Sequence, residues 1–381
     1  MYPETTTKNQ YTAIQPHLYI AFELSQKEWL LGFTTGFGQK PRLRSIPARD
    51  LASLQKEIQL AKNRFGLPED VQVVSCYEAG RDGFWLDRYL HSQGVDNLVV
   101  DSASIEVNRR AKQAKTDRLD LGKLLTMLMR YHSGEKKVWS VVHVPTASVE
   151  DNRHLHRELA NLKAQRTQHT NRIKGYLANQ GICLTVEDDF PETLKQLRLW
   201  NGDPLPPSLL ARLLFEFERF QLVEKQIKTL EKERQDAIRN STQPDVEQVR
   251  KLLQLRGIGI NCAWLYVMEF FSWRAFHNRR EVGALAGLTP LPHQSGEEAH
   301  ELGISKIGNR HIRAMAIEIA WIWLRYQPDS ELSRWYQRRF GKGSKRLHKI
   351  GIVALARKLL IEIWRYHEFG TIPPGAVLKT S

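Results

Sequence analysis

The first 145 residues carry short apolar runs, rich in β-branched and aromatic side chains, that are separated by segments with helical spacing of apolar residues. These runs predict strands at 17–24, 29–35, 42–47, 71–77 and 97–101. The helical spacing predicts helices at 49–65, 83–93 and 116–131. Three strands, followed by alternating helices and strands, predict an α/β domain with a mixed sheet over residues 1–145.

The pattern changes in residues 146–245, which are polar and charged. Leucine, isoleucine and phenylalanine recur at helical spacing in 148–180 and 207–238, and several helix breakers lie between these segments. We expect two long helices that form an antiparallel coiled-coil arm. The match to strict heptads is loose, so two ordinary bundle helices stay open as the alternative.

Residues 246–381 are predicted to form a third domain that is mostly helical, with apolar-rich segments at 251–271, 312–326 and 350–367. The chain has no apolar run of the ~18 residues that a membrane span needs. Its start, MYPETTTKNQYT, lacks the features of a signal peptide, and its three cysteines form no CxxC pair. A cytoplasmic protein without a membrane partner is therefore expected.

Charge points to a polyanionic partner. The net charge is +14, and ten of these excess positive charges fall in residues 246–381. The basic residues do not form a single amphipathic helix, which disfavours a membrane surface. Nucleic acid is the commonest large polyanion, so it is the expected partner.

Four carboxylates occupy positions that favour metal binding. Glu23 ends the first predicted strand, Glu78 ends the fourth, and Asp117 and Asp120 share one face of a helix because they are three residues apart. Like charges on one face repel, and a divalent cation is the usual offset. Mg²⁺ prefers carboxylate oxygens, so these four acids are candidate Mg²⁺ ligands. Each acid alone is more often a solvated surface residue.

Two further segments indicate contacts with phosphate. In RGIGINCAWL, Gly257 and Gly259 lie between two predicted helices, where backbone N–H groups can approach a phosphate, as in a helix-hairpin-helix. A plain tight turn is the alternative for that segment. In HQSGEEAHELGISKIGNRHIR, Ser295 precedes a basic run. Two interpretations of Ser295 stay open: it is a nucleophile that attacks a phosphate, or it is part of a solvated loop that precedes a basic helix.

The order of several motifs resembles a known family. It comprises YIAFELS, YEAGRDGFW, AKTDRLD, NRIKGYLANQGI, LRGIGINCAWL, LAGLTP, QSG, GISKIGNRHIR and VALARKLLIEIWRYHEFGTIPPGA. From about residue 17 to 376, the chain resembles the DEDD-serine transposases of bacterial insertion sequences. These are relatives of the Piv DNA invertase and are known as bridge-RNA-guided recombinases.

This resemblance implies a RuvC-like, ribonuclease H-like domain over 1–145, a coiled-coil arm over 146–245 and a serine transposase domain over 246–381. It implies catalytic roles for Ser295 and for the four acids as Mg²⁺ ligands. The implied partners are donor and target DNA, a guide RNA and further copies of the chain, as a homodimer or homotetramer. The implied nucleic-acid-binding residues are Lys115, Arg118, Gly257, Gly259, Lys306, Asn309, Arg310 and Arg313.

The chain departs from the family at Glu23, where the family usually has Asp, and no Asp occurs before Asp50. The extra methylene moves the carboxylate by about one C–C bond, and Mg²⁺ tolerates geometric error poorly. We therefore expect metal binding or rate to differ at this position. Besides the RNA-guided recombinase, two functions stay open. One is a metal-dependent nuclease of the Holliday-junction type with a structural Ser295, and the other is a catalytically impaired nucleic-acid-binding relative.

Overall fold

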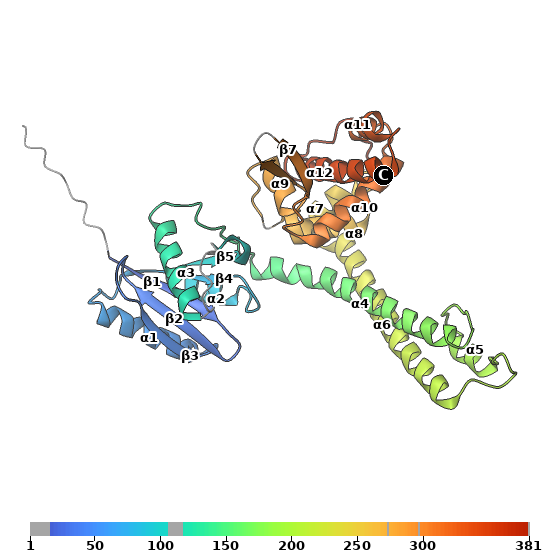
Figure 1. The fold of residues 1–381 in the computed structure, drawn as a ribbon, viewed down its shortest axis with the longest axis horizontal. Coiled ribbons are helices and arrows are strands. Elements are labelled where there is room, and N and C mark those ends of the chain that lie inside the picture. The colour runs from blue at the N-terminus through green and yellow to red at the C-terminus, as the bar shows by residue number, and fades with distance from the viewer. Residues whose placement is uncertain (1–15, 106–116, 273, 296–297, 380–381) are drawn as a thin grey trace, which may run out of the picture. The chain divides into compact units, whose positions relative to one another are not determined.

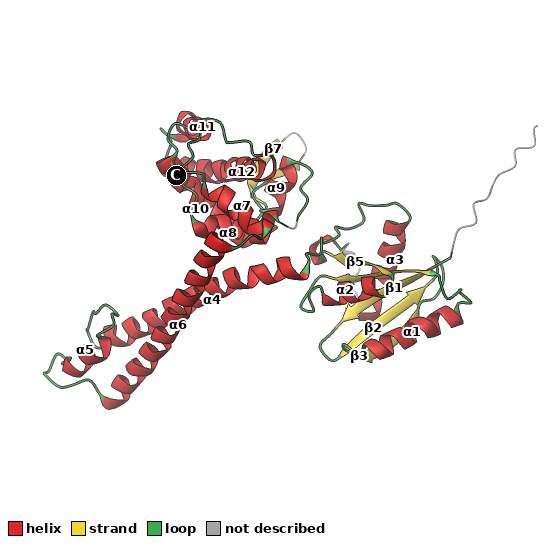
Figure 2. Ribbon diagram, turned by 180° about the vertical axis from the view of Figure 1, so that it is seen from behind, coloured by secondary structure: helices red, strands yellow, loops and turns green. Residues whose placement is uncertain are grey.

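The computed structural model describes residues 16–105, 117–272, 274–295 and 298–379. Contacts divide the chain into two compact units, residues 1–145 and 146–381. Figure 1 colours the elements along the chain, and Figure 2 colours them by type.

The first unit contains a five-stranded sheet in the order β3-β2-β1-β4-β5. Its strands are β1 (His17–Leu24), β2 (Glu28–Thr34), β3 (Arg42–Pro47), β4 (Gln72–Glu78) and β5 (Val95–Val100). β2 runs antiparallel to both of its neighbours, β1 and β3, whereas β4 runs parallel to β1 and β5 runs parallel to β4. The predicted mixed α/β sheet is confirmed.

Helices cover both faces of this sheet. α1 (Leu51–Arg64) and α2 (Trp85–Ser92) bury one face in a core that includes Phe22 and Tyr77. α3 (Asp117–His132) covers the other face, against Ala21 and Cys76. Gly32 permits this close packing, since a Cβ there would meet the Leu121 side chain at 2.9 Å.

The second unit begins with two long antiparallel helices, which match the two predicted segments. α4 (Ala147–Ala178) and α6 (Pro207–Asn240) lie side by side, and the short α5 (Phe190–Gln196) packs near their distal end (Figure 1). Leu159 and Leu162 of α4 pack against Val223 and Ile227 of α6 in a narrow apolar seam. Ion pairs such as Arg166–Glu224, at 3.1 Å, flank this seam. We call this helix pair the arm.

Helices surround the core of the C-terminal region. Its elements are α7 (Pro244–Leu253), α8 (Ile260–Tyr266), the π-helical turn η2 (Val267–Phe271), α9 (Arg279–Leu285), β6 (Pro290–Ser295), β7 (Glu298–Ile304), α10 (Arg310–Tyr326), α11 (Glu331–Phe340) and α12 (Lys345–Phe369). The root of the arm joins this core, because Leu155 and Ile238 pack against it. Among the described residues, no helix is both long and apolar enough to cross a lipid bilayer.

Candidate active site

Glu23 and Glu78 lie on neighbouring parallel strands at the same edge of the sheet. Phe22 of β1 pairs with Tyr77 of β4, so the two glutamates occupy the next position on each strand. Phe22 and Tyr77 both face the core beneath α1 and α2. Because side chains alternate along a strand, Glu23 and Glu78 both project toward the opposite face, which α3 covers. Glu23 is half-buried and Glu78 is exposed.

The direction of α3 brings its first turn toward this edge. Its last residue, His132, shares a hydrogen bond of 2.9 Å with the hydroxyl of Tyr19, near the start of β1. Leu121, close to its first turn, packs over Gly32, which pairs with Ala21 further along β1. The helix therefore runs antiparallel to β1, and its amino-terminal end points to the carboxyl end of that strand.

Asp117 and Asp120 occupy this first part of α3, and the Asp120 side chain is half-buried. The side chain of Asp117 lies outside the described part of the structure. Among the side chains that are described, no group of three or more His, Cys, Asp or Glu is close enough to hold a metal ion. The backbone thus brings the positions of all four acids to one edge and one face of the sheet.

Sequence reasoning missed a fifth acid at this edge. Asp101 directly follows β5 and is exposed, and its backbone N–H donates to the Ser140 carbonyl at 2.9 Å. Val100, the residue before it, pairs with Glu78. The sequence signal for Asp101 was its position directly after a strand that runs parallel to β4, because parallel strands present their carboxyl ends at one edge of a sheet.

Ser295 lies on a β-hairpin and not in the loop that the sequence suggested. β6 and β7 pair antiparallel, and Ser295 opposite Glu298 is the last pair before the tip. The tip and the side chains of residues 292–302 are outside the described set. The structure therefore defines the position of Ser295 at the end of a strand.

Two glycine turns interlock at the base of this hairpin. The N–H of Asn309 donates to the Leu285 carbonyl at 2.8 Å, and the N–H of Lys306 donates to the Gly287 carbonyl at 3.2 Å. Gly287 and Gly308 both have positive φ, +67° and +123°. A Cβ at Gly308 would lie 2.3 Å from the Leu285 carbonyl oxygen, so only glycine fits there.

Two of the predicted nucleic-acid-binding residues support these turns. Arg313 donates through Nη1 to the carbonyls of Lys306, at 2.9 Å, and Ala286, at 3.3 Å. Asn309 caps α10, because its Oδ1 accepts from the N–H groups of His311 and Ile312. The side chains of Lys306 and Arg310 are exposed at the same place and are free to contact a ligand.

Comparison of the chain with known proteins identifies its family. The chain is 39% identical over 377 residues to a putative transposase of Sinorhizobium fredii, and the alignment covers 95% of each chain. The chain belongs to the IS116/IS110/IS902 family of transposases. Residues 249–336 match that family directly.

More distant relatives have names of the same kind. The transposase for insertion sequence element IS1328 of Yersinia enterocolitica is 26% identical over 241 residues, covering 61% of this chain and 68% of that protein. A probable family 20 transposase of Pseudomonas aeruginosa is 27% identical over 231 residues, covering 59% and 66%. In this transposase the directly matched segment runs from the end of α7 into α11 and includes the Ser295 hairpin.

The glycine turn between α7 and α8 of the transposase is partly covered by the segment 376–379. The N–H of Arg256 donates to the Val377 carbonyl at 3.2 Å, and Lys379 Nζ donates to the Ile258 carbonyl at 2.9 Å. Gly257 has φ +95°, and Gly259 caps α8, which has only seven residues. These contacts leave fewer backbone groups of the turn for phosphate than the sequence suggested.

Two predicted nucleic-acid-binding residues of the transposase remain, Lys115 and Arg118. Lys115 is outside the described residues, and Arg118 is exposed on the first turn of α3. Its position on α3 is thus next to that of Asp117.

Proposed function

We propose that this transposase is a site-specific DNA recombinase with a RuvC-like first domain, which cuts and rejoins DNA through a covalent link to Ser295. One observation carries the proposal. Glu23 and Glu78 share an edge and a face of parallel strands β1 and β4, and α3 directs Asp117 and Asp120 to that edge. The strand order β3-β2-β1-β4-β5, with acids after the central strands, supports the ribonuclease H-like assignment.

The chemistry of the acids fits Mg²⁺, because carboxylate oxygens are the ligands that this ion prefers. Glu23, Glu78, Asp117 and Asp120 would hold it. When bound, the ion supplies charge stabilisation to a phosphate that is being displaced. Exposed Arg118 next to these acids would hold a neighbouring phosphate in register.

Ser295 supplies the nucleophile in this proposal. Its Oγ forms a bond to the scissile phosphorus, the bond from phosphorus to the leaving sugar oxygen breaks, and the leaving strand takes up the proton. A hydroxyl of another strand then attacks the phosphoserine and restores the serine hydroxyl. One phosphodiester is exchanged for another, so ATP is not required. In this proposal the acids and Ser295 serve the same phosphodiester exchange.

We further propose that a guide RNA selects the donor and target DNA, as the sequence resemblance implies. Lys115 and Arg118 would contact one nucleic-acid backbone, and the basic run at 306–313 would contact another. The arm and the segment that joins its two helices would mediate dimerisation or tetramerisation, because they expose the apolar side chains of Trp200, Phe215 and Leu222. Recombination that persists after complete removal of RNA would refute the guide.

The decisive experiment traps the covalent intermediate. Labelled DNA is incubated with the protein and Mg²⁺, and label that migrates with protein is measured under denaturing conditions. Ser295→Ala should abolish this label and strand exchange while DNA binding persists. Ser305→Ala, at the base of the same hairpin, is the matched control and should retain both.

A second pair of variants tests the acids. Asp117→Ala should abolish cleavage through loss of metal, whereas Asp96→Ala, at the opposite end of the sheet on β5, should not. Cutting that is undiminished in Ser295→Ala would reassign the protein to the nuclease class. DNA binding without cutting by the wild type would identify an impaired relative.

A further inference from the structure

A basic groove borders the base of the Ser295 hairpin. It encloses about 1010 Å³ between α9, the hairpin base and α12. Cationic side chains line it from three places: Arg279 and Arg280 of α9, Lys306 of the turn that follows β7, and Arg346, Lys349 and Arg357 of α12. Pro290 and Ile304, at the two ends of the hairpin base, also line it. We call this cavity the α12 groove.

The positive charge of the α12 groove is not neutralised within the described part of the chain. Its single acidic lining residue, Glu362, forms an ion pair of 2.8 Å with Arg365. None of the six cations named above forms a salt bridge to a carboxylate among the described residues. Several like charges in one concave surface repel each other, and a bound polyanion removes that cost.

Local structure fixes the direction of these cations. Ser344 caps α12 by accepting from the N–H of Leu347, so Arg346 and Lys349 stand one turn apart at the start of the helix. The Arg357 side chain packs over Gly283 of α9, because its Nε lies 3.5 Å from the position of a Cβ there, an ordinary van der Waals contact. The positions from Arg346 to Arg365 span about 28 Å of helix, close to the rise of ~8 base pairs.

The remaining lining distinguishes a duplex from a single strand. The floor of the α12 groove is aliphatic, with Ile304, Ile350, Val353 and Ile361. No aromatic side chain is among the described residues that line it. Proteins that bind single strands stack bases on aromatic rings, and this surface offers no such platform. Aliphatic and cationic side chains suit the sugar-phosphate backbone of a duplex instead.

We infer that the α12 groove binds one backbone of a DNA duplex and directs that duplex to the hairpin that carries Ser295. This inference rests on the proposed function, because it assigns the position of the DNA that Ser295 would attack. It also assigns a role to the basic segment that precedes and starts α12, FGKGSKR at 340–346, because Arg346 of this segment lines the groove. The groove contributes backbone contacts and no base recognition, so its binding is independent of sequence.

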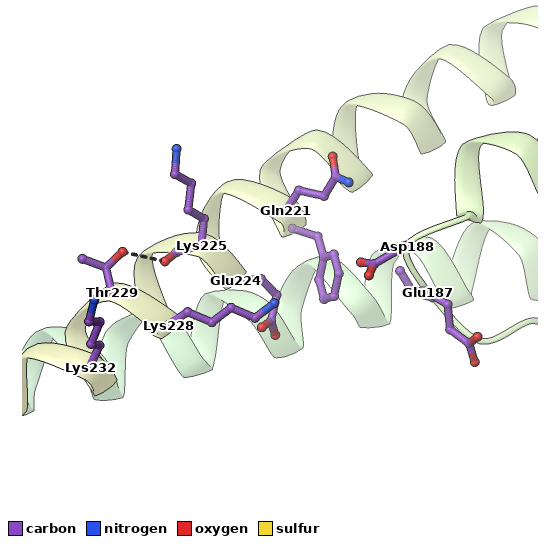
Figure 3. Close-up of a pocket in the computed structure, with 10 residues that line it drawn as sticks. Glu187, Asp188, Gln221, Glu224, Lys225, Lys228, Thr229 and Lys232 are labelled. Atoms are coloured by element: carbon purple, nitrogen blue, oxygen red, sulfur yellow. Dashed lines mark hydrogen bonds between the residues drawn. The ribbon is translucent and has the colours of Figure 1, made fainter. Parts of the chain in front are cut away.

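The test compares two triple variants of the full chain that lose the same charge. Arg280→Gln, Arg346→Gln and Lys349→Gln neutralise both walls of the groove at exposed positions, so folding is preserved. The control is Lys225→Gln, Lys228→Gln and Lys232→Gln on α6, which Figure 3 shows at a separate arm pocket and which are also exposed. Binding of a fluorescent mixed-sequence DNA duplex is measured by anisotropy over a range of salt concentrations, without Mg²⁺.

The groove variant should bind the duplex at least about tenfold more weakly, and the slope of log K against log salt should decrease in magnitude by about 2–3. The arm control should keep the wild-type affinity and slope. Equal losses in both variants would reduce the effect to net charge and overturn the inference. Stronger loss for a single strand or an RNA duplex than for the DNA duplex would also overturn it.

The readout separates this inference from the proposed chemistry. Duplex binding requires no cleavage, so a loss confined to the groove variant supports the groove even if the wild type forms no phosphoserine. A wild-type phosphoserine link together with unchanged binding by the groove variant would retain the chemistry and reject the groove.

Discussion

A single carbonyl oxygen determines which residue can stand at position 308. Gly308 packs its backbone against Leu285, and Arg313 supports the facing turn through the Lys306 and Ala286 carbonyls. From the sequence alone, Arg313 is predicted to bind phosphate because it belongs to a basic run. In the folded chain this guanidinium is hydrogen-bonded to backbone, which a sequence cannot show because the two turns are about 20 residues apart.

Gly308→Ala should destabilise the C-terminal unit by about 2–4 kcal/mol, because it combines a positive φ with a contact of 2.3 Å to backbone. Gly303→Ala is the control, since nothing lies within 4 Å of a Cβ at that position. Urea unfolding measures both. Equal stabilities of the two variants would contradict the interlocking role of Gly308.

Glu23 provides a second test at this scale. Glu23→Gln keeps the size of the side chain and removes the charge of a proposed Mg²⁺ ligand, so Mg²⁺-dependent cleavage should fall by at least about 100-fold. Glu23→Asp restores the residue that is usual in the family and should retain cleavage. The Mg²⁺ concentration for half-maximal cleavage is the measurement. A Glu23→Gln variant with wild-type Mg²⁺ dependence would exclude this carboxylate from the metal site.

At the scale of elements, the sequence predicted the first sheet within one or two residues at each strand. Its strands either alternate apolar and polar residues or are apolar on both faces, so the hydrophobic pattern of the sequence predicts them directly. It failed at β6 and β7, where PLPHQS and EAHELGI contain few β-branched or aromatic residues. The structure shows these strands by their antiparallel backbone pairing with each other. Glu23 and Glu78 could be assigned to strand ends because strand ends are visible in the sequence, whereas the direction of α3 could not be predicted from it.

The junction between the arm and η2 was also invisible in the sequence. Arg157 of α4 donates to both carboxylate oxygens of Glu269, at 2.5 and 3.0 Å, and Glu269 is buried on the π-helical turn. Helical turns of this type occur often at functional sites. The ion pair anchors the arm to the core that carries the serine hairpin.

Arg157→Ala should therefore lower stability by about 1–3 kcal/mol, because it leaves the buried Glu269 carboxylate without its partner. Lys163→Ala breaks an ion pair of 2.7 Å with Glu231 on the exposed part of the arm and should cost less than about 1 kcal/mol. Chemical unfolding compares them. A larger cost for Lys163→Ala would refute the anchoring role.

At the scale of the whole molecule, the free energy of unfolding should depend on pH through two histidines. Burial lowers the pKa of His156 and His367 to about 4 in the folded chain. Between about pH 6.5 and 4 the unfolded chain binds more protons at these sites. The free energy of unfolding is thus at its full value above pH 6.5 and falls as the pH decreases through this window.

His367→Leu should weaken this dependence. At about pH 5 the variant should recover about 1–2 kcal/mol relative to the wild type, and at about pH 7.5 the difference should be smaller. Urea unfolding at the two pH values, followed by tryptophan fluorescence, measures the change. His154→Gln, at an exposed position of α4, is the control. A parallel shift of the variant at both pH values would contradict the titration of His367.

The contact of segment 376–379 with the glycine turn after α7 also has a kinetic consequence. The hydrogen bond from Lys379 to Ile258 closes a loop of 121 residues, and Tyr366 bonds Gln254 across 112. Contacts of such long sequence separation form late, because the entropy of the whole intervening loop is lost before they stabilise the chain. The helices between them must therefore be in place first. Folding of this region should be slow and should end with the closure of segment 376–379 over the glycine turn after α7.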